Sequence, residues 1–527
     1  MSGANVSCIE QNAVVGMKNP KVFGFLPTAS ADQNVIALQA AVSGGGLIIV
    51  DTPGVYELND TILLDSNTKL ICTHGVVFKK VAPYCNVLLN RGALTKEYNE
   101  NITIDGLEIS VNGYEGKPTL VYGLRAQLGF FYIKNLSIKN FVCLDGKAYQ
   151  FLIYIVTWEH LYIDKVRLAG DKDGIKLNNG HDAIISNLDL TTYDDGMSLC
   201  GTDYPSVVLE VGDVYNICYS NVTDHQYKNI FGRTCLIYTG AWADYAKDNE
   251  YRTGDFCLNN GKLYQCANEH GSVIKSSVAP VHSAGIVTGS DTISWRYIQN
   301  CDFYHTDVYN VTFDNCIFEK SGNLIAVWVE SNGYHRTHYP GTEKLSNSRG
   351  ISITNCKMKA SGEQVLVCVT GKLKDVIIAN CVLDNLEAVI RIDSYSSNEV
   401  LNVSITGCTF KNTINPLVAV HNGKKVVDWA MPFTHIGTPG YIALETPTGD
   451  CDPQRNTPII VNCHLSGNSL CDATFGNTVS DGAKLRFVNM DLPFNSLENL
   501  TPEIGDLCRH VDGLFIYKAT GWFNLSA

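Results

Sequence analysis

The stretches NVTFDNC (310–316), GISITNC (350–356), DVIIANC (375–381) and LNVSITGC (401–408) are four copies of one phrase. In each copy apolar and polar residues alternate, and an Asn or Gly then precedes a Cys. Strict alternation is typical of a strand that buries one face. The phrase recurs, with or without the cysteine, at 101–106, 135–140, 160–165, 182–187, 215–221 and 459–463. Repeated short strands are therefore expected to make up most of the chain.

The spacing of these phrases predicts how the strands are arranged. Where no insertion intervenes they lie roughly 22 to 27 residues apart, which suits one solenoid coil with about three short strands. A single coil cannot bury its own apolar face, so the coils must stack at roughly 4.8 Å. No helical pattern of about 10–15 residues separates the strands, as a βαβ fold would require. The sequence thus predicts an all-β solenoid, a parallel β-helix.

The chain has 19 cysteines, a high and odd number. The repeat aligns several of them, together with its Asn residues, into ladders along the stack. We expect these cysteines to be small buried core residues rather than disulfide partners. They are Cys316, Cys356, Cys381, Cys408 and Cys463. No CxxC pair or Cys/His cluster has zinc-site spacing, so neither a metal nor another cofactor is expected.

Two departures from the repeat mark the limits of the solenoid. ADQNVIALQAAV (31–42) has helical spacing and precedes the first strands, so it is expected to cap the apolar end of the stack. Coil spacing breaks near 243 and resumes after 298, which indicates a small inserted β module. The expected parts are an N-terminal segment (1–30), a first β-helix part with its cap (31–242), the module (243–298), a second β-helix part (299–490) and a C-terminal hairpin (491–527).

Composition limits the function classes. The net charge of −13 gives no basic footprint for nucleic-acid binding, which needs clustered basic surface. No run of about eighteen apolar residues occurs, so no membrane span is expected. The first residues, MSGANVSCIEQNAVVG, lack the pattern of a secretory signal. The expected setting is extracellular, with the signal removed, or virion-associated, with release by host lysis.

The segment DKDGIKLNNGHDAIISNLDLTTYDDGMSLCGTD (171–203) carries the strongest chemical signal. Asp173 and Asp194 are 21 residues apart, about one coil, which places their backbones roughly 5 Å apart on adjacent coils. Asp195 adds a third carboxylate, provided that a bend near Gly196 keeps it on the same side as Asp194. Like charges this close raise at least one pKa, and glycoside hydrolysis needs one protonated and one ionised carboxyl group. We therefore expect these three aspartates to be catalytic.

The start of the repeat resembles the pectate-lyase-like β-helix proteins, in which a helix precedes a "GG…V…PG.Y" strand pair. The corresponding residues are Gly44, Gly45, Gly46, Val50, Pro53, Gly54 and Tyr56. The acidic segment resembles the polygalacturonases, whose motifs are Asn-Thr-Asp-Gly and, one coil later, Gly-Asp-Asp-Cys. The partial matches are Asp171-Lys172-Asp173-Gly174 and Tyr193-Asp194-Asp195-Gly196. The resemblance implies a right-handed β-helix and an inverting hydrolase, in which Asp194 or Asp195 protonates the leaving oxygen while the other two carboxylates activate water.

The chain departs from the polygalacturonases where they bind substrate. Phe231-Gly232-Arg233-Thr234 stands where the family has Gly-His-Gly, and LIAVWVES (324–331) stands where it has Arg-x-Lys. The missing basic pair indicates a sugar other than galacturonan. Six residues are predicted to line the substrate groove, with Arg233 the strongest candidate. The others are His225, Lys176, Tyr238, Trp242 and Glu330.

The inserted module resembles small chitin- and cellulose-binding domains. YRTGDFCLNNGKLYQCANEH (251–270) and SWRYI (294–298) carry the pattern, and GDLC (505–508) with VDGLFIYKATGWFNL (511–525) echoes it near the C-terminal end. The matching residues are Tyr251, Gly254, Asp255, Asn260, Gly261, Lys262, Tyr264 and Trp295. Their aromatic rings either lie exposed and stack on sugars, or form the core that so small a module needs. The sequence leaves both interpretations open.

The predicted function is cleavage of a polysaccharide by a protein that resembles a phage tailspike depolymerase. Tailspikes of this fold are usually homotrimers, and the resemblance implies the same here. A bacterial glycan-degrading enzyme is the competing setting. Two other function classes stay open. One is a polysaccharide lyase, with the aspartates as calcium ligands and Arg233 as base, and the other is a non-catalytic adhesin that binds glycans.

Overall fold

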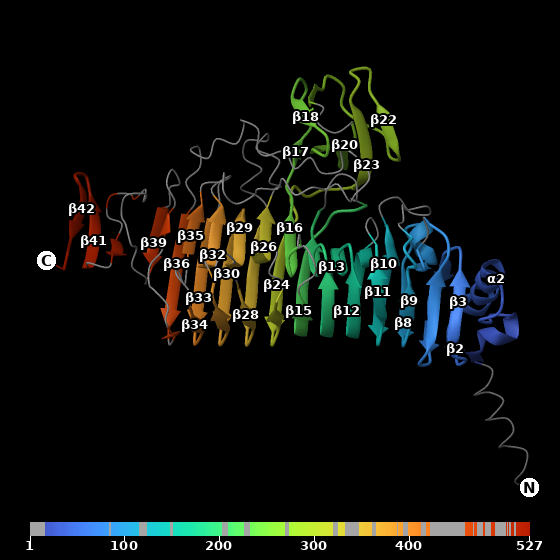
Figure 1. Cartoon of the computed structure of the whole chain (residues 1–527). Coiled ribbons are helices and arrows are strands. Elements are labelled where there is room, and N and C mark those ends of the chain that lie inside the picture. Colours follow the sequence, from blue (N-terminus) through green and yellow to red (C-terminus); the bar gives the residue numbers. More distant parts are fainter. Residues whose placement is uncertain are drawn as a thin grey trace, which may run out of the picture. The chain divides into compact units, whose positions relative to one another are not determined.

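The computed structural model is almost entirely β-structure (Figure 1). The chain divides into two compact units: unit 1 is Met1–Met197 with Asn221–Lys228, and unit 2 is Ser198–Ser220 with Asn229–Ala527. The structure describes residues 16–526 except 84–85, 115–123, 148–150, 203–208, 226–231, 269–272, 320–324, 332–346, 361–364, 387, 394–398, 413–417, 422–458, 467, 472–477, 480–485, 491–501, 503, 505–506 and 511–512.

Unit 1 is a stack of parallel coils. Its main column consists of β2 (Gly46–Val50), β5 (Thr68–Cys72), β8 (Asn99–Asp105), β10 (Ala126–Lys139), β12 (Phe151–Gly170) and β13 (Ile175–Thr192). Each strand pairs in parallel with the next, which brings Leu70, Ile104, Ile138, Ile163 and Ile185 into register. All five side chains are fully buried. The alternation of the repeated phrase therefore points its apolar residues into one continuous core.

Shorter strands complete the coils of unit 1. A second parallel column consists of β3 (Gly54–Leu58), β6 (Val76–Lys80), β9 (Glu108–Ser110) and β11 (Val142–Gly146). A third begins with β4 (Ile62–Leu64) and β7 (Leu88–Asn90) and continues into β10. β1 (Met17–Lys18) pairs with β2, and the short 3-10 helices are η1 (Pro20–Phe23) and η2 (Arg91–Leu94).

Helix α2 (Ala31–Val42) closes the end of this stack, next to β2 and β3 in Figure 1. Ser30 and Gln33 form a capping box that fixes its first turn. Its inner face is apolar, and Leu38 is fully buried. The Gln39 side chain also binds the backbone N–H and C=O of Leu63 at 2.8 and 2.9 Å, so it satisfies polar groups on the edge of β4 (Ile62–Leu64). The predicted capping helix is confirmed.

Unit 2 repeats the same plan. Its main column is β15 (Val214–Asp224, whose last four residues belong to unit 1), β24 (Val308–Asp314), β27 (Ser348–Thr354), β30 (Lys372–Ala379), β33 (Glu399–Thr406), β36 (Ile459–Ser466) and β39 (Arg486–Met490). The second is β25 (Ile317–Phe318), β28 (Lys357–Lys359), β31 (Val382–Asp384), β34 (Thr409–Lys411) and β37 (Ser469–Cys471). The third is β16 (Cys235–Thr239), β26 (Ile325–Ser331), β29 (Val365–Thr370), β32 (Ala388–Asp393), β35 (Val418–His421) and β38 (Thr478–Val479). The fold is the right-handed parallel β-helix that the sequence predicts.

The Asn and Cys ladders occur as predicted. Asn101 and Asn135 both have φ between +54° and +58°, and Asn135 Nδ2 donates to Asn101 Oδ1 at 3.1 Å. Asn tolerates this left-handed backbone and its side chain bonds to the Asn one coil away, which explains its recurrence at the turn. In unit 2 four cysteines of the ladder are buried free thiols: Cys316, Cys356, Cys381 and Cys408. The side chain of Cys463 lies outside the described part of the chain.

The inserted module belongs to unit 2 and forms a sheet with the order β17-β19-β20-β23-β22, in which β17 pairs with β19 in parallel and the other neighbours are antiparallel. These strands are β17 (Ala243–Asp244), β19 (Phe256–Asn259), β20 (Lys262–Cys266), β23 (Ser294–Asn300) and β22 (Ile286–Thr288), and β18 (Glu250–Arg252) pairs with β21 (Val273–Lys275). Tyr251, Tyr264 and Trp295 are at most 2 % exposed and pack into one cluster. The interpretation of these rings as an exposed sugar-stacking surface is therefore wrong, because the module needs them for its core.

The chain ends in a three-stranded antiparallel sheet of β40 (Leu507–His510), β41 (Gly513–Lys518) and β42 (Gly521–Asn524). This extends the hairpin predicted for 491–527 by one strand. Within the described residues, no helix has both the length and the apolar character needed to cross a bilayer.

Candidate functional site

The acidic segment forms two stacked turns in unit 1. Residues 171–174 join β12 to β13, and residues 193–196 join β13 to β14 (Met197–Cys200). Gly174 N donates to Asp195 O at 2.9 Å, and Ile175 N donates to Gly196 O at 3.0 Å. This register makes the coil 22 residues long here, as the pairing of Lys172 with Asp194 also shows. Asp173 is thus level with Asp195, one residue away from the Asp173–Asp194 match that the sequence predicts.

The two turns approach each other closely at Gly174. A Cβ on this residue would lie 2.6 Å from Gly196 O, a distance at which the backbone would have to move. Residues 193–196 also leave the extended conformation, and the bend expected near Gly196 is present. Asp194 and Asp195 both contribute to the electrostatics at Asp173 as a result. The glycines therefore hold three carboxylates in one cluster.

A lysine that the sequence analysis did not select lies at the centre of this cluster. The Lys172 ammonium is 2.9 Å from Asp173 Oδ1 and also forms an ion pair with Asp194 Oδ2. The Asp173 side chain is 4 % exposed, against 14 % for Asp194 and 21 % for Lys172. Asp195 is also buried. The Lys172 side chain is therefore more exposed than those of Asp173 and Asp194, and it lies against the carboxyl of Asp173.

Burial dominates the electrostatics of this site. It raises the pKa of Asp173 to about 6, although Lys172 opposes the shift, and the negative charge of Asp194 adds to it. Burial alone would lower the pKa of Lys172, but the charges of Asp173 and Asp194 outweigh it and raise that pKa instead. At neutral pH the site therefore combines a carboxyl group that titrates close to neutrality with an ammonium that stays charged.

Three positively charged side chains around this cluster lie near the ring of Phe151. The Nζ atoms of Lys172 and Lys176 lie 5.3 and 5.1 Å from the centre of its ring, and the guanidinium of Arg125 lies 5.8 Å away. All three are within the range of cation–π attraction. Lys176, a predicted groove residue, is only 3 % exposed on β13 and lowers the pKa of Asp173. Its place is thus beneath the acidic turn.

His225 has a different environment in unit 1. Its Nε2 lies 3.3 Å from Asp189 Oδ1, and Arg167 Nε lies 3.5 Å from the other oxygen of the same carboxylate. The imidazole is 42 % exposed. His225 therefore belongs to a surface charge row on the outside of β12 and β13, where a structural role explains its contacts.

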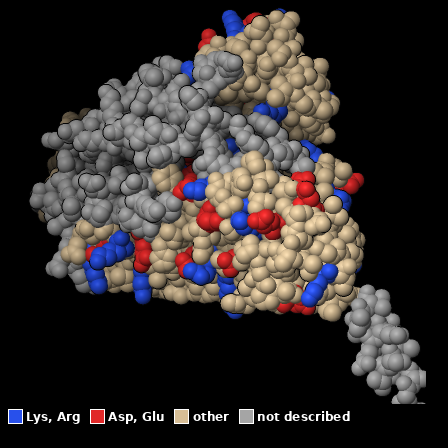
Figure 2. All heavy atoms as spheres, turned by 45° about the vertical axis from the view of Figure 1, so that its right-hand side comes forward, with Lys and Arg blue, Asp and Glu red and all other residues tan. Residues whose placement is uncertain are grey.

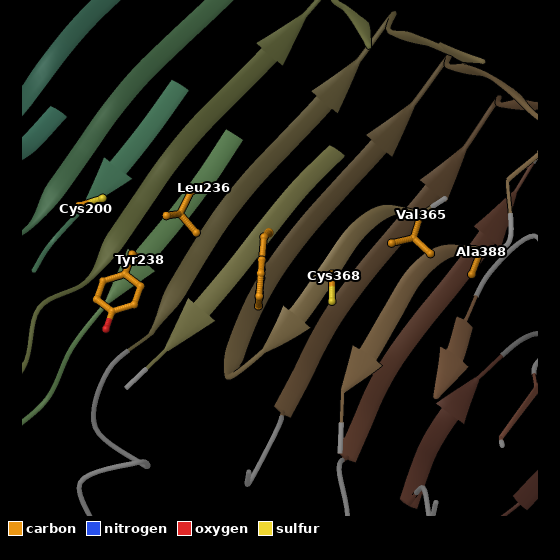
Figure 3. Packing of buried hydrophobic residues seen from close by; sticks show 7 residues of the cluster. Cys200, Leu236, Tyr238, Val365, Cys368 and Ala388 are labelled. Carbon is orange, nitrogen blue, oxygen red and sulfur yellow. The ribbon is translucent and has the colours of Figure 1, made fainter. Parts of the chain in front are cut away.

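The four predicted groove residues of unit 2 are all buried. Arg233 is 4 % exposed, and its guanidinium lies 4.2 Å from the ring centre of Trp328, a residue that sequence reasoning missed. Glu330 is 1 % exposed and pairs in register with Tyr238. Figure 3 shows Tyr238 with Cys200, Leu236 and Cys368 in a buried cluster.

Trp242 is fully buried as well. It packs against Phe256 and Phe303, and its Nε1 donates to Phe303 O at 2.8 Å. Neither Trp242 nor Tyr238 presents a ring face on which a sugar could stack. Both rings are accounted for by packing.

The exposed charges of the protein are mixed in sign. Figure 2 shows basic and acidic side chains interspersed over the face it displays. Pairs such as Lys134–Glu159 and Lys79–Glu57, each at 3.0 Å, contribute to this pattern. Among the described residues, no group of three or more His, Cys, Asp or Glu side chains is placed to hold a metal ion.

Neither a family model nor a curated protein matches the chain. Solved structures resemble it at low identity. The A-module of the mannuronan C-5 epimerase AlgE6 from Azotobacter vinelandii is 13% identical, with a TM-score of 0.48, and the match covers 92% of this chain and 99% of that one. The tailspike of E. coli bacteriophage HK620, solved with a hexasaccharide, is 12% identical, with a TM-score of 0.44 over 95% and 73%. The family 28 exopolygalacturonase of Yersinia enterocolitica is 11% identical, with a TM-score of 0.40 over 77% and 78%.

Proposed function

We propose that this chain hydrolyses glycosidic bonds in a polysaccharide and that Asp173 is the proton donor. The observation that carries the proposal is the raised pKa of Asp173, about 6, in a cluster with two further carboxylates. Glycoside hydrolysis needs one carboxyl group that holds a proton near neutral pH and a second that is ionised. A buried carboxyl beside like charges meets the first requirement.

Asp194 and Asp195 are the candidates for the base that activates water. The Lys172 ammonium balances the charge of Asp194, and Asp195 is level with Asp173 on the next coil. In an inverting mechanism the base removes a proton from water while the acid protonates the leaving oxygen. This assignment exchanges the roles that the resemblance to polygalacturonases implies, because the raised pKa belongs to Asp173.

A lyase is the weaker candidate. A lyase base removes a proton from carbon and must itself be unprotonated near neutral pH. Arg233, the base expected for a lyase, is 4 % exposed and its guanidinium lies over the ring of Trp328, and the raised pKa of Lys172 counts against that lysine as an alternative base. Arg233, Glu330, Lys176 and His225 stay predictions as substrate-binding residues. We propose an extracellular or virion-associated setting, with a capsular, cell-surface or plant glycan as substrate.

The test is a screen of the purified protein against capsular and plant polysaccharides, with product mass analysis. Hydrolysis adds one water per cut, whereas a lyase leaves an unsaturated product that absorbs in the ultraviolet. Asp173→Asn should lower the rate of cleavage about 10²- to 10⁴-fold. Asp189→Asn is the matched control, because Asp189 is a half-exposed carboxylate of the surface charge row on the same unit. Cleavage by Asp173→Asn at close to the wild-type rate, or products with unsaturated ends, would contradict the proposal.

A further inference from the structure

In unit 1, one corner of the coils is occupied by residues that its backbone disfavours. Tyr132, Thr157 and Asn179 lie in register on three successive coils, with φ of +58°, +51° and +48°. Asparagine tolerates this left-handed conformation, whereas a bulky tyrosine and a β-branched threonine rarely adopt it. Asn179 Nδ2 donates to Thr157 Oγ1 at 3.0 Å, so bonds between coils support part of the corner. A strained backbone is retained where the side chain has a use, which makes the surroundings of the Tyr132 ring informative.

The Tyr132 ring lies against a second tyrosine. It makes an edge contact with Tyr98, with ring centres 5.2 Å apart and planes inclined by 72°. Tyr98 is 39 % exposed, and Tyr132 is half-buried. The Lys134 ammonium lies 4.3 Å from the centre of the Tyr98 ring and 3.0 Å from Glu159 Oε1. These four residues, called here the tyrosine shelf, form a surface of two aromatic rings beside a partly exposed ion pair.

The loop that presents Tyr98 is closely tied to the coil beside it. Asn99, directly after Tyr98, accepts a 2.6 Å hydrogen bond from Gly92 N and donates one of 3.0 Å to Ser66 Oγ. Glu97, directly before Tyr98, donates from its backbone N–H to Gly92 O at 3.0 Å. A Cβ on Gly92 would lie 1.9 Å from Glu97 O, so the loop closes on itself at a glycine. Tyr98 is therefore held in place before any ligand arrives, which keeps the entropic cost of binding low.

We infer that the tyrosine shelf binds a sugar ring of a polysaccharide. A pyranose has an apolar face of C–H groups, which packs on an aromatic ring, and hydroxyl groups around its edge. The Lys134 ammonium and the Glu159 carboxylate offer a donor and an acceptor 3.0 Å apart, which suits two neighbouring hydroxyl groups. A protein partner would need roughly 800 Å² on each side, far more than two rings and one ion pair provide.

The tyrosine shelf is a different site from the acidic turn. Asp173 and Asn179 belong to the same coil and are six residues apart, so an extended strand places the corner roughly 20 Å from the turn. Tyr132 lies two coils before Asn179 in the stack. One sugar ring cannot contact both sites. The inference therefore goes beyond the proposed cleavage and does not need it, because the shelf would hold a glycan whether or not the acidic turn cuts it.

The test is binding of the labelled full-length protein to a microarray of plant, algal and bacterial capsular polysaccharides. All proteins carry Asp173→Asn, so that cleavage cannot remove the ligand and the result does not depend on the proposed hydrolysis. The polysaccharide bound most tightly is then titrated, and Tyr98→Ala should raise its Kd about tenfold. Absence of binding to every polysaccharide, or an unchanged Kd in Tyr98→Ala, would overturn the inference.

Tyr162→Ala is the matched control. Tyr162 is 37 % exposed on β12 of the same unit, and the Lys139 ammonium lies 4.9 Å from its ring centre, much as Lys134 lies over Tyr98. Tyr162 therefore matches Tyr98 in exposure and in its cation–π contact but lies outside the tyrosine shelf. The control should keep the Kd of the parent protein. An equal loss in both variants would mean that exposed tyrosines bind glycans without a built site, and the inference would be wrong.

A further variant separates binding from packing at the corner. Tyr132→Asn places a residue that accepts φ +58° at the strained position, so relief of the backbone should offset the lost ring contact. The urea midpoint should stay the same or rise, while the Kd rises as in Tyr98→Ala. A clear loss of stability would mean that packing selects Tyr132, and either this result or an unchanged Kd would contradict the inference.

Discussion

In unit 1, the left-handed corner at Asn135 inside strand β10, called here the asparagine turn, and the acidic turn at Asp173 are both polar and stacked on a neighbouring coil, yet their chemistry differs. Asn135 adopts a left-handed backbone and donates a 3.1 Å hydrogen bond to Asn101, so its polar groups serve the fold. Burial raises the pKa of Asp173 to about 6, although the Lys172 ammonium opposes the shift, and the charge of Asp194 adds to it. The asparagine turn follows the local rules of the repeat, whereas the acidic turn keeps charges that packing alone would not select. Such departures mark functional sites.

The strongest test of this contrast is Asp173→Asn. It removes the proposed proton donor but keeps the size of the side chain, so kcat should fall about 10²- to 10⁴-fold. The melting temperature at pH 8 should stay the same or rise, since the substitution removes a buried charge that Asp194 and Asp195 repel. Cleavage rates and thermal unfolding of the same preparation measure both effects. A loss of activity together with a large loss of stability would mean that Asp173 is a structural residue.

The reverse result is expected at the asparagine turn. Asn135→Ala removes both the polar side chain that lets asparagine adopt φ +54° and its hydrogen bond to Asn101, so the free energy of unfolding should fall by about 2 kcal/mol. Activity per folded molecule should not change. Urea unfolding of the variant gives the free energy, and Asn135→Gly is the control, because Gly accepts this backbone and loses only the hydrogen bond. If Ala and Gly are equally destabilising, the backbone conformation does not explain the ladder.

The fold was predictable from sequence because its physics is local and repeated. Alternating phrases such as those that contain Ile138 and Ile163 define both the strand and its buried face, and these two residues are in register as expected. Helix α2 was predictable for the same reason, since spacing and a capping residue define it.

The site was predictable only in part. Asp173, Asp194 and Asp195 come together as predicted, but the register is 22 residues rather than 21, because backbone hydrogen bonds at Gly174 determine it. Lys172 lies between two aspartates in the motif Asp171-Lys172-Asp173-Gly174, and this sequence context could have identified it. The burial of Tyr238 and Trp242 depends on packing between residues far apart in sequence, which no local pattern reveals.

A smaller effect is expected from a substitution of Lys172, which forms ion pairs with Asp173 and Asp194. Lys172 lowers the pKa of Asp173, so Lys172→Gln should raise that pKa further above 6. Because a general acid acts in its protonated form, the alkaline limb of the kcat profile should move up by about one pH unit. Lys165→Gln, at an outer turn of the same unit, is the control and should leave the limb in place. If the alkaline limb moved to lower pH instead, the limb would not reflect the ionisation of Asp173.

The last prediction concerns the pH dependence of stability. The folded-state pKa of Asp173, about 6, is above its unfolded value of 3.8, so the folded state binds more protons between these values. Its contribution to stability is therefore complete below pH 4 and is lost as the pH rises through 6, by at most about 1.4 kcal/mol per pH unit.

Asp164 opposes this trend in the wild-type protein. Burial pushes its pKa up, but hydrogen bonds from Asn187 and Ser186 outweigh burial and lower it, so its contribution to stability is lost as the pH falls. The pH dependence of the total stability therefore contains contributions of both signs. The difference in stability between the wild type and Asp173→Asn isolates the contribution of Asp173. Urea unfolding of both proteins at pH 4, 5, 6 and 7 should show the wild type losing stability relative to the variant as pH rises. A constant difference would mean that Asp173 titrates alike in both states, and the acidic turn would then resemble the asparagine turn in its energetics.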